Sequence, residues 1–177
     1  LLIMRTFLLL FILLLPSSKT TPIVKEKIIV KKEVEVKEIK GMNEFLYAIG
    51  HQESGNRYFV INRFGYMGKY QFGKSTLKTL KIKVTKEAFL NSPDLQEYAM
   101  QQNLLHNKNK LQKYIDRFDG CKIDGILVTE SGILAAAHLG GPGSVKKYFR
   151  SGKIARDGNG VKITNYMRRF SGYTLYL

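Results

Sequence analysis

The chain has 177 residues, of which 44% are hydrophobic and 24% are charged, a composition that is ordinary for a globular protein. Its 29 Lys and Arg residues outnumber its 14 Asp and Glu residues, which gives a formal net charge of +15 at pH 7. That excess indicates a polyanionic partner, which could be nucleic acid, anionic lipid or an acidic wall polymer, unless it is only a solvated basic surface. The lone cysteine, Cys121, excludes an intramolecular disulfide and a zinc site built from cysteines.

Residues 1–18 predict a secretory signal peptide. Arg5 precedes the apolar run Phe7–Leu15, which is followed by the helix breaker Pro16 and two serines. This run is much shorter than the roughly 20 apolar residues that span a bilayer. An uncleaved signal anchor is the alternative, because the residues before Met4 are also apolar. We expect a secreted, periplasmic or cell-envelope protein with no stable membrane span.

Residues 19–40 are predicted to be a charged tether, and residues 41–177 a single folded domain. The tether mixes Lys, Glu, Ile and Val without a turn signal. Apolar spacing and capping residues predict helices in the domain at Met42–Glu53, Ser75–Leu80, Pro93–Leu105, Glu130–Leu139, Ser144–Phe149 and Lys162–Phe170. Strand candidates are few and short: Phe59–Asn62, and Lys162-Ile163 if the turn Asp157–Gly160 closes a hairpin. The predicted fold class is mainly α.

Glu53 ends the first predicted helix on the face that carries its apolar residues. At about 100° per residue it lies roughly 20° from Leu46 and 40° from Ile49 around the helix. A carboxyl group there loses hydration, which disfavours its charged form, and the negative end of the helix dipole acts in the same direction. Glu53 therefore fits a proton donor for a glycosidic oxygen. The alternative is a solvated glutamate in the loop after the helix.

Two later segments contain residue types that suit a sugar-binding groove. Tyr66, Tyr70 and Phe72 offer flat apolar faces between glycines, and Gln71 can donate and accept at one hydroxyl or acetamide group. A Gly-rich loop with packed aromatic rings is the alternative for this segment. The run Ala135–Leu139 also fits a close helix–helix contact made by small residues.

Taken in this order, the segments resemble the goose-type lysozyme and soluble lytic transglycosylase superfamily, in its phage- and Bacteroidetes-like variant. Glu53-Ser54 resembles the catalytic "ES", Gly68–Gln71 the "GLMQ" segment of the saccharide cleft, and Ala136–Gly143 the "AAYNAGPG" segment. The resemblance covers about residues 42–149. It implies a lysozyme-like α+β fold with a saccharide cleft, in which Glu53 is catalytic. The substrate-binding residues that it implies are Ser54, Tyr70, Gln71, His138 and Tyr166.

The chain departs from the family pattern at two places. Where the family commonly has Tyr-Asn, this chain has His138-Leu139, and the family's Tyr usually supports the catalytic Glu. Either His138 or Tyr166 would therefore have to take that role, and His138 as a simple core histidine is the alternative. The Leu-Met pair of "GLMQ" is replaced by Lys69-Tyr70, which leaves Gln71 as the matched cleft residue.

The resemblance implies cleavage of peptidoglycan between N-acetylmuramic acid and N-acetylglucosamine. A lytic transglycosylase needs one carboxyl group and leaves a 1,6-anhydro product, and this is the activity we expect. The hydrolytic lysozyme is an alternative, and it requires a second carboxylate about 5 to 9.5 Å from the first. The acids available for that role are Asp94, Asp124, Glu130 and Asp157, none of which lies in a family motif. A non-catalytic module that binds cell wall or another polyanion is the second alternative.

Peptidoglycan glycan strands are the expected partner, and anionic wall polymers are a further candidate because of the basic charge. Secretion argues against nucleic acid, and we expect a monomer. The three histidines, His51, His106 and His138, are scattered, and no stretch has the spacing of metal ligands. We therefore predict no metal and no cofactor.

Overall fold

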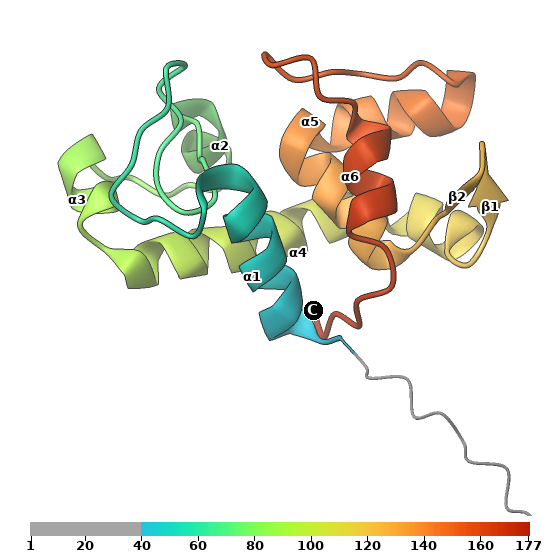
Figure 1. Cartoon of the computed structure of the whole chain (residues 1–177), viewed down its shortest axis with the longest axis horizontal. Helices are drawn as coiled ribbons and strands as arrows, with labels where there is room; N and C mark the ends of the chain where they lie inside the picture. Colours follow the sequence, from blue (N-terminus) through green and yellow to red (C-terminus); the bar gives the residue numbers. More distant parts are fainter. Residues whose placement is uncertain (1–39) are drawn as a thin grey trace, which may run out of the picture. The chain divides into compact units, whose positions relative to one another are not determined.

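A computed structural model describes residues 40–177 (Figure 1). The predicted signal peptide, residues 1–18, and the predicted tether, residues 19–40 except for Lys40, lie outside the described residues. The described part is mainly helical, as predicted, with six α-helices and one small antiparallel sheet. No helix in this part is both long enough and apolar enough to cross a membrane.

The helices and strands follow one another in the order α1, α2, α3, α4, β1, β2, α5 and α6. Their bounds are α1 Met42–Ser54, α2 Lys74–Thr79, α3 Lys86–Leu90, α4 Pro93–Phe118, β1 Lys122–Ile123, β2 Ile126–Leu127, α5 Glu130–Ser151 and α6 Ile163–Arg169. The cap of α4 is the predicted Ser92, whose hydroxyl oxygen accepts a hydrogen bond from the backbone N–H of Leu95. Thr129 caps α5 in the same way by accepting from Gly132.

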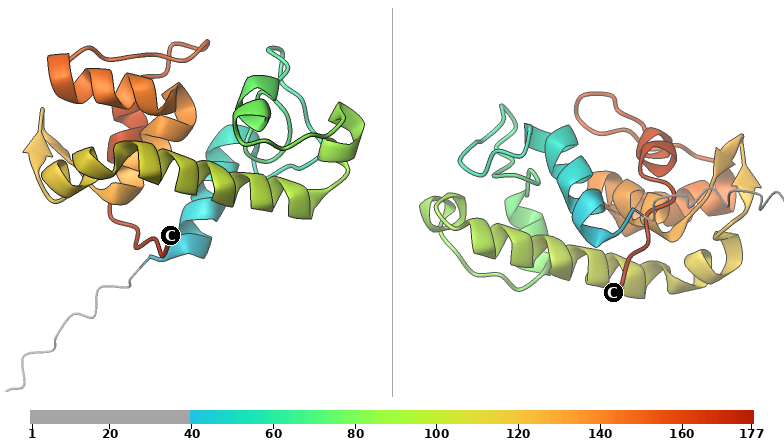
Figure 2. Two further views of the ribbon diagram at one scale, coloured as in Figure 1. Left: turned by 180° about the vertical axis from the view of Figure 1, so that it is seen from behind. Right: turned by 60° about the horizontal axis from the view of Figure 1, so that its bottom comes forward.

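The long helix α4 connects two halves of the domain (Figures 1 and 2). The short helices α2 and α3 and the loop after α1 lie along its N-terminal half, whereas α5, α6 and the β1–β2 hairpin lie along its C-terminal half. Helix α1 crosses α4 between them. Fully buried residues from three helices form the centre of the core, including Phe45, Ile49, Leu104, Leu111 and Ile133. The burial of these side chains holds α1 and α5 against α4 and so joins the two halves of the domain.

Helix α4 is longer than the sequence predicted, since it continues past Leu105 to Phe118. Its buried face runs on through Leu111 and Ile115, but Asn107 interrupts the apolar pattern. Asn107 is nevertheless buried, because its Nδ2 donates a hydrogen bond to Oδ1 of Asn103 one turn earlier, at 3.3 Å. A paired asparagine therefore occupies a core position that the apolar period alone could not identify.

Two predicted helices, Glu130–Leu139 and Ser144–Phe149, are parts of the single element α5. The predicted break between them is a kink: Gly141 has φ 76° and ψ 159°, which is far from helical geometry, and Pro142 follows it. Positive φ is accessible to glycine without steric cost, so Gly141 suits this bend. Helix α3 and the β1–β2 hairpin were not predicted, because each is too short to show a period.

Candidate active site

A groove of about 670 Å³ is lined by residues from seven regions, namely the helices α1, α2, α4, α5 and α6 and the two long loops after α1 and α5. Its volume lies in the range of about 300 to 1,000 Å³ that ligand sites occupy. Side chains that can hydrogen-bond a sugar line it: Gln52, Asn62, Gln71, Ser75, Thr76, Thr79, Asn103, His106 and Asn107. Phe64, Tyr66 and Phe72 add aromatic surface.

A second hollow of about 500 Å³ lies between the C-terminal ends of α4 and α5. It is lined by three cationic and three aromatic side chains, namely Lys113, Tyr114, Arg117, Phe118, Phe149 and Arg150. No carboxyl group is among them, so this hollow contains no general acid. The larger groove contains Glu53 and Asp157 and is the candidate active site.

Glu53 is the penultimate residue of α1, and its side chain lies in the groove with 14% of its surface exposed. Its Oε1 accepts a hydrogen bond of 2.7 Å from the hydroxyl of Tyr166 and lies 3.9 Å from Nε2 of His138. Among residues 40–177, Oε2 has no hydrogen-bond partner. One oxygen is thus held in place by the protein, while the other is available to a ligand.

Tyr166, on α6, is the residue that holds Glu53. Burial raises the pKa of the Tyr166 phenol far above its usual value, and the negative charge of Glu53 and the hydrogen bond to it act in the same direction. The phenol therefore keeps its proton and can only donate toward Oε1. Of the two residues considered for the support of Glu53, Tyr166 makes the hydrogen bond and His138 does not.

His138, on α5, lies beside Glu53 but is held by other partners. Its Nδ1 is 3.0 Å from Nδ2 of Asn103, and its Nε2 is 3.1 Å from the carbonyl oxygen of Tyr70. Oδ1 of Asn103 already accepts from Asn107, so Nδ2 of Asn103 is the donor and Nδ1 of His138 the acceptor. The proton of the ring then lies on Nε2 and is donated to Tyr70. His138 connects α5 to the backbone of the Gly68–Phe72 segment.

Gln71 lies in the groove near this contact. Its backbone has φ 52°, in the left-handed region, and its Nε2 donates to the carbonyl of Gly68 at 2.8 Å. No protein partner of Oε1 is present among the described residues. The side-chain carbonyl of Gln71 is therefore free to accept a hydrogen bond from a ligand.

The structure does not place Ser54 or Tyr70 in the groove, although both were predicted to bind substrate. Ser54 is buried, and its Oγ donates to the carbonyl of Lys69 at 2.8 Å and accepts from the N–H of Arg57 at 2.9 Å. Tyr70 is fully buried, and its hydroxyl donates to Oε2 of Glu97 at 2.6 Å. The prediction that Ser54 and Tyr70 bind substrate is therefore wrong. Both side chains point into the protein, where their hydrogen bonds stabilise the segments behind the groove.

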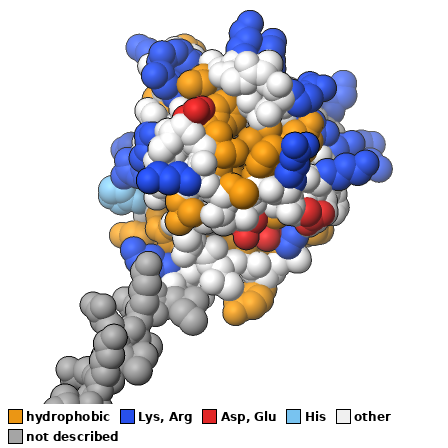
Figure 3. All heavy atoms as spheres, turned by 90° about the vertical axis from the view of Figure 1, so that its right-hand side faces the viewer, with side chains coloured by type: hydrophobic (Ala, Val, Ile, Leu, Met, Phe, Trp, Pro, Cys, Tyr) orange, Lys and Arg blue, Asp and Glu red, His pale blue; other side chains and the backbone are white. Residues whose placement is uncertain are grey.

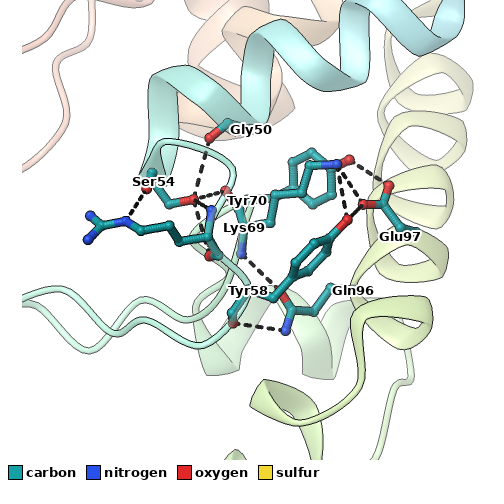
Figure 4. Close-up of polar contacts among 8 residues, drawn as sticks. Gly50, Ser54, Tyr58, Lys69, Tyr70, Gln96 and Glu97 are labelled. Atoms are coloured by element: carbon teal, nitrogen blue, oxygen red, sulfur yellow. Dashed lines mark hydrogen bonds and ion pairs between the residues drawn. The ribbon is translucent and has the colours of Figure 1, made fainter.

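The framework behind the groove centres on Glu97 of α4 (Figure 4). Its carboxylate accepts from the hydroxyls of Tyr58 and Tyr70 and from the ammonium group of Lys69, at 2.6 to 2.7 Å. Burial by itself would raise the pKa of Glu97, but the hydrogen bonds from Lys69, Tyr70 and Tyr58 outweigh it and lower the pKa. Glu97 is therefore an ionised anchor.

The neighbouring Gln96 fixes the backbone of the same segment (Figure 4). Its Oε1 accepts from the N–H of Lys69 at 2.8 Å, and its Nε2 donates to the carbonyls of Tyr58 and Phe89. Gly68 has φ 75°, and a Cβ at this position would collide with the Gln96 amide. The glycine in the "GLMQ"-like segment is thus required for a close approach between the loop and α4.

Of the four acids considered as a second carboxylate, Asp157 is the one that lines the groove. Its Oδ1 accepts from the N–H groups of Asn159 and Val161, at 2.9 and 2.7 Å, which braces the turn before α6. Asp124 instead accepts from Tyr148 at 3.0 Å, Glu130 pairs with Lys108 at 2.9 Å, and Asp94 lies in the first turn of α4. The Asp-Gly-Asn-Gly turn signal located this loop in the sequence but gave no indication that it reaches the groove.

Asn103 and Asn107 are groove residues that sequence reasoning missed, since isolated asparagines in a helix carry no catalytic pattern. Among residues 40–177, no three His, Cys, Asp or Glu side chains gather into a cluster that could hold a metal ion. No protein-family model, curated protein or solved structure matches this chain. The resemblance to the lysozyme and transglycosylase superfamily therefore remains a prediction.

Proposed function

We propose that this protein cleaves the glycan strand of peptidoglycan between N-acetylmuramic acid and N-acetylglucosamine, as a lytic transglycosylase with Glu53 as its acid and base. The observation that carries the proposal is the setting of the Glu53 carboxyl group. It lies in a groove of saccharide size, with Oε1 held by a phenol and Oε2 without a protein partner. The amide, hydroxyl and aromatic groups of the same lining suit a chain of acetylated sugars.

In this mechanism Oε2 of Glu53 delivers a proton to the glycosidic oxygen as the bond to the anomeric carbon breaks. The acetamide oxygen of the muramic residue attacks that carbon and forms a cyclic intermediate. The carboxylate of Glu53 then removes the proton of the 6-hydroxyl group, whose oxygen displaces the acetamide and closes the 1,6-anhydro ring. Proton and charge return to their starting positions, so a single protein carboxyl group suffices.

Tyr166 orients Glu53 for both proton transfers and favours the first. Its hydrogen bond fixes the orientation of the Glu53 carboxyl group, so that Oε2 is the oxygen that faces a ligand. When Glu53 loses its proton, the same hydrogen bond becomes charge-assisted and stronger. Tyr166 thus stabilises the form of Glu53 that follows the first step.

The decisive experiment is mass spectrometry of peptidoglycan digested by the mature protein. We expect muropeptides that end in 1,6-anhydro-N-acetylmuramic acid. Reducing ends in their place would reject the transglycosylase and support the hydrolytic lysozyme. A digest without any released muropeptide, from protein shown to be folded, would reject both activities.

The hydrolase is the alternative that one observation favours, because Asp157 lies in the same groove as Glu53. Its negative charge is one of the smaller causes of the raised pKa of Tyr166. Two backbone N–H groups hold Oδ1 of Asp157, and Oδ2 remains to activate a water molecule. Under this alternative Asp157→Asn abolishes the formation of reducing ends, whereas the transglycosylase keeps forming anhydro ends.

A non-catalytic wall-binding module would use the basic surface rather than Glu53. Figure 3 shows one face of the molecule, on which Lys and Arg side chains surround a central group of hydrophobic side chains. Such a face attracts anionic polymers, and the attraction weakens as salt is added. Binding to sacculi that never leads to lysis, by the unaltered protein as well as by Glu53→Gln, would favour the module.

A further inference from the structure

Two loops from opposite sides of the groove project toward each other on one side of the molecule (Figures 1 and 2). The first, residues 55–73, connects α1 to α2, and the second, residues 152–162, connects α5 to α6. Both contribute to the lining of the groove that contains Glu53: Asn62, Phe64 and Tyr66 from the first, and Asp157, Gly158 and Asn159 from the second. The contact between them therefore bears on how a polymer enters.

The tips of the loops touch through two contacts, which we call the link. Nη2 of Arg63 donates a hydrogen bond of 2.9 Å to Oδ1 of Asn159, across 96 residues of sequence. The ring of Phe64 lies against Gly158, where an added Cβ would be 3.4 Å from the ring carbon Cζ. The guanidinium of Arg63 also lies 4.7 Å from the centre of the Phe64 ring. Arg63 and Phe64 thus meet the opposite loop as one unit.

Each loop is braced from within, so the link joins two ordered tips. Oδ1 of Asn62 accepts from the N–H groups of Phe64 and Tyr66, at 2.9 and 3.1 Å. On the other loop Asp157 accepts from Asn159 and Val161 through its side chain, and an antiparallel bridge joins Arg156 to Lys162. Preorganised tips lose little conformational entropy when they meet.

A link between two walls of a groove has a direct consequence for a linear polymer. Where the link joins the two loops, a continuous strand cannot pass sideways between their tips. A strand must either enter by its end or wait until the link opens. Arg63 and Asn159 are exposed and share a single hydrogen bond, and Phe64 and Gly158 are exposed as well, so the link can open without disturbing the core.

We propose that the link between Arg63 and Asn159 makes strand ends the preferred substrate, so that the enzyme acts mainly in the exo mode. This inference rests on the function proposed above and specifies which part of the glycan strand that site accepts. Arg63 and Asn159 are specificity residues in this proposal, since neither forms a hydrogen bond or ion pair with Glu53, Tyr166 or His138.

The test follows the lengths of glycan strands that carry a label at one end during digestion. The unaltered protein should release small anhydro products while the remaining strands stay long. Arg63→Ala, which removes the hydrogen bond of the link and leaves only the Phe64–Gly158 contact, should raise the ratio of internal to terminal cuts about fivefold, the ratio that one lost hydrogen bond supports. Arg150→Ala removes an equal charge at the second hollow, outside the groove, and should leave the ratio unchanged.

A second variant tests the link in the opposite direction. Asn159→Asp places a carboxylate opposite the Arg63 guanidinium and strengthens the contact. It should therefore lower the fraction of internal cuts, and Arg63→Ala should cancel that effect in the double variant. Identical length profiles for the unaltered protein, Arg63→Ala and Asn159→Asp would overturn the proposal, even if all three make anhydro ends.

A binding experiment can test the role of the link even if the protein has no catalytic activity. The unaltered protein would then release no product from any strand, which is a different result from an unchanged length profile. The two proteins to compare are Glu53→Gln and the double variant Glu53→Gln with Arg63→Ala. For each, binding to intact sacculi, in which strand ends are scarce, is measured beside binding to short soluble strands. Opening the link should raise binding to sacculi relative to binding to short strands. The same ratio of the two in both proteins would reject the selection of strand ends.

Discussion

Glu53 and Glu97 make an instructive comparison, because both are partly buried glutamates that accept a short hydrogen bond from a tyrosine. Glu97 has three donors, one of which is the ammonium group of Lys69, and its side chain lies outside the groove. Among residues 40–177, Glu53 has one donor, and its second oxygen has no hydrogen-bond partner. The side-chain exposure of Glu97, 29%, exceeds the 14% of Glu53, so exposure does not identify the reactive group. The reactive group is identified instead by the second carboxylate oxygen of Glu53, which the described residues leave without a hydrogen bond.

The largest expected effect is on activity, when Glu53 is changed. Glu53→Gln keeps the size of the side chain but removes the proton that the mechanism transfers, so lysis of sacculi should fall by about 10² to 10⁴-fold. Turbidity loss of a sacculus suspension measures it, with circular dichroism as the check on folding. Glu44→Gln makes the same chemical change in the first turn of the same helix and should keep full activity. Lysis by Glu53→Gln at the normal rate would show that Glu53 is not the acid.

Glu97→Gln should have the opposite profile, with its main effect on stability. It leaves the Lys69 ammonium without its counter-charge, and breaking a buried ion pair costs about 3 to 5 kcal/mol. Because Glu97 is partly exposed and Gln can still accept from one phenol, we expect the free energy of unfolding to fall by about 2 kcal/mol. Urea unfolding measures this change, and Glu87→Gln on the exposed surface of α3 is the control. An unchanged midpoint would contradict the role of Glu97 as an anchor.

A smaller effect is expected from Tyr166→Phe, which removes the single donor to Glu53. The loss of one hydrogen bond to the carboxylate should lower kcat about tenfold, equivalent to about 1.4 kcal/mol in the barrier. KM should change little, because the other residues that line the groove stay in place. Tyr98→Phe, at an exposed tyrosine of α4, is the matched control. A rise in KM with normal kcat would mean that Tyr166 binds substrate instead of supporting the acid.

The smallest effect is the dependence of the Glu97 contribution on pH. The lowered pKa of Glu97 means that its contribution to stability is present above its ordinary pKa of 4.5 and is lost as pH falls through the lower value in the folded protein. The stability difference between the unaltered protein and Glu97→Gln should therefore shrink in acid. Urea midpoints at pH 7, 4 and 3 measure it. A difference that stays constant down to pH 3 would contradict an ionised Glu97.

Local patterns were sufficient for much of the helical framework. Ser92 and Pro93 located the start of α4, and Gly141 with Pro142 located the break in α5, because caps and breakers act within one turn of the chain. The position of Glu53 at the end of an apolar stripe follows from helical geometry in the same way. The far end of α4 was missed because the buried Asn107 is satisfied by Asn103, and such pairing is invisible in an apolar period.

What only the tertiary structure decided is the set of partners for each polar side chain. From the sequence, Ser54, Tyr70 and Gln71 were all predicted to bind substrate, but of the three only Gln71 lines the groove. The sequence likewise allowed either His138 or Tyr166 beside Glu53, and the packing of α6 brings the Tyr166 hydroxyl to 2.7 Å from Oε1. Sequence by itself determined most of the helices and the place of Glu53 in the last turn of α1, because those depend on neighbours along the chain. Hydrogen bonds between residues about 100 positions apart depend on how the helices pack, so the site and the link between its walls came from the fold.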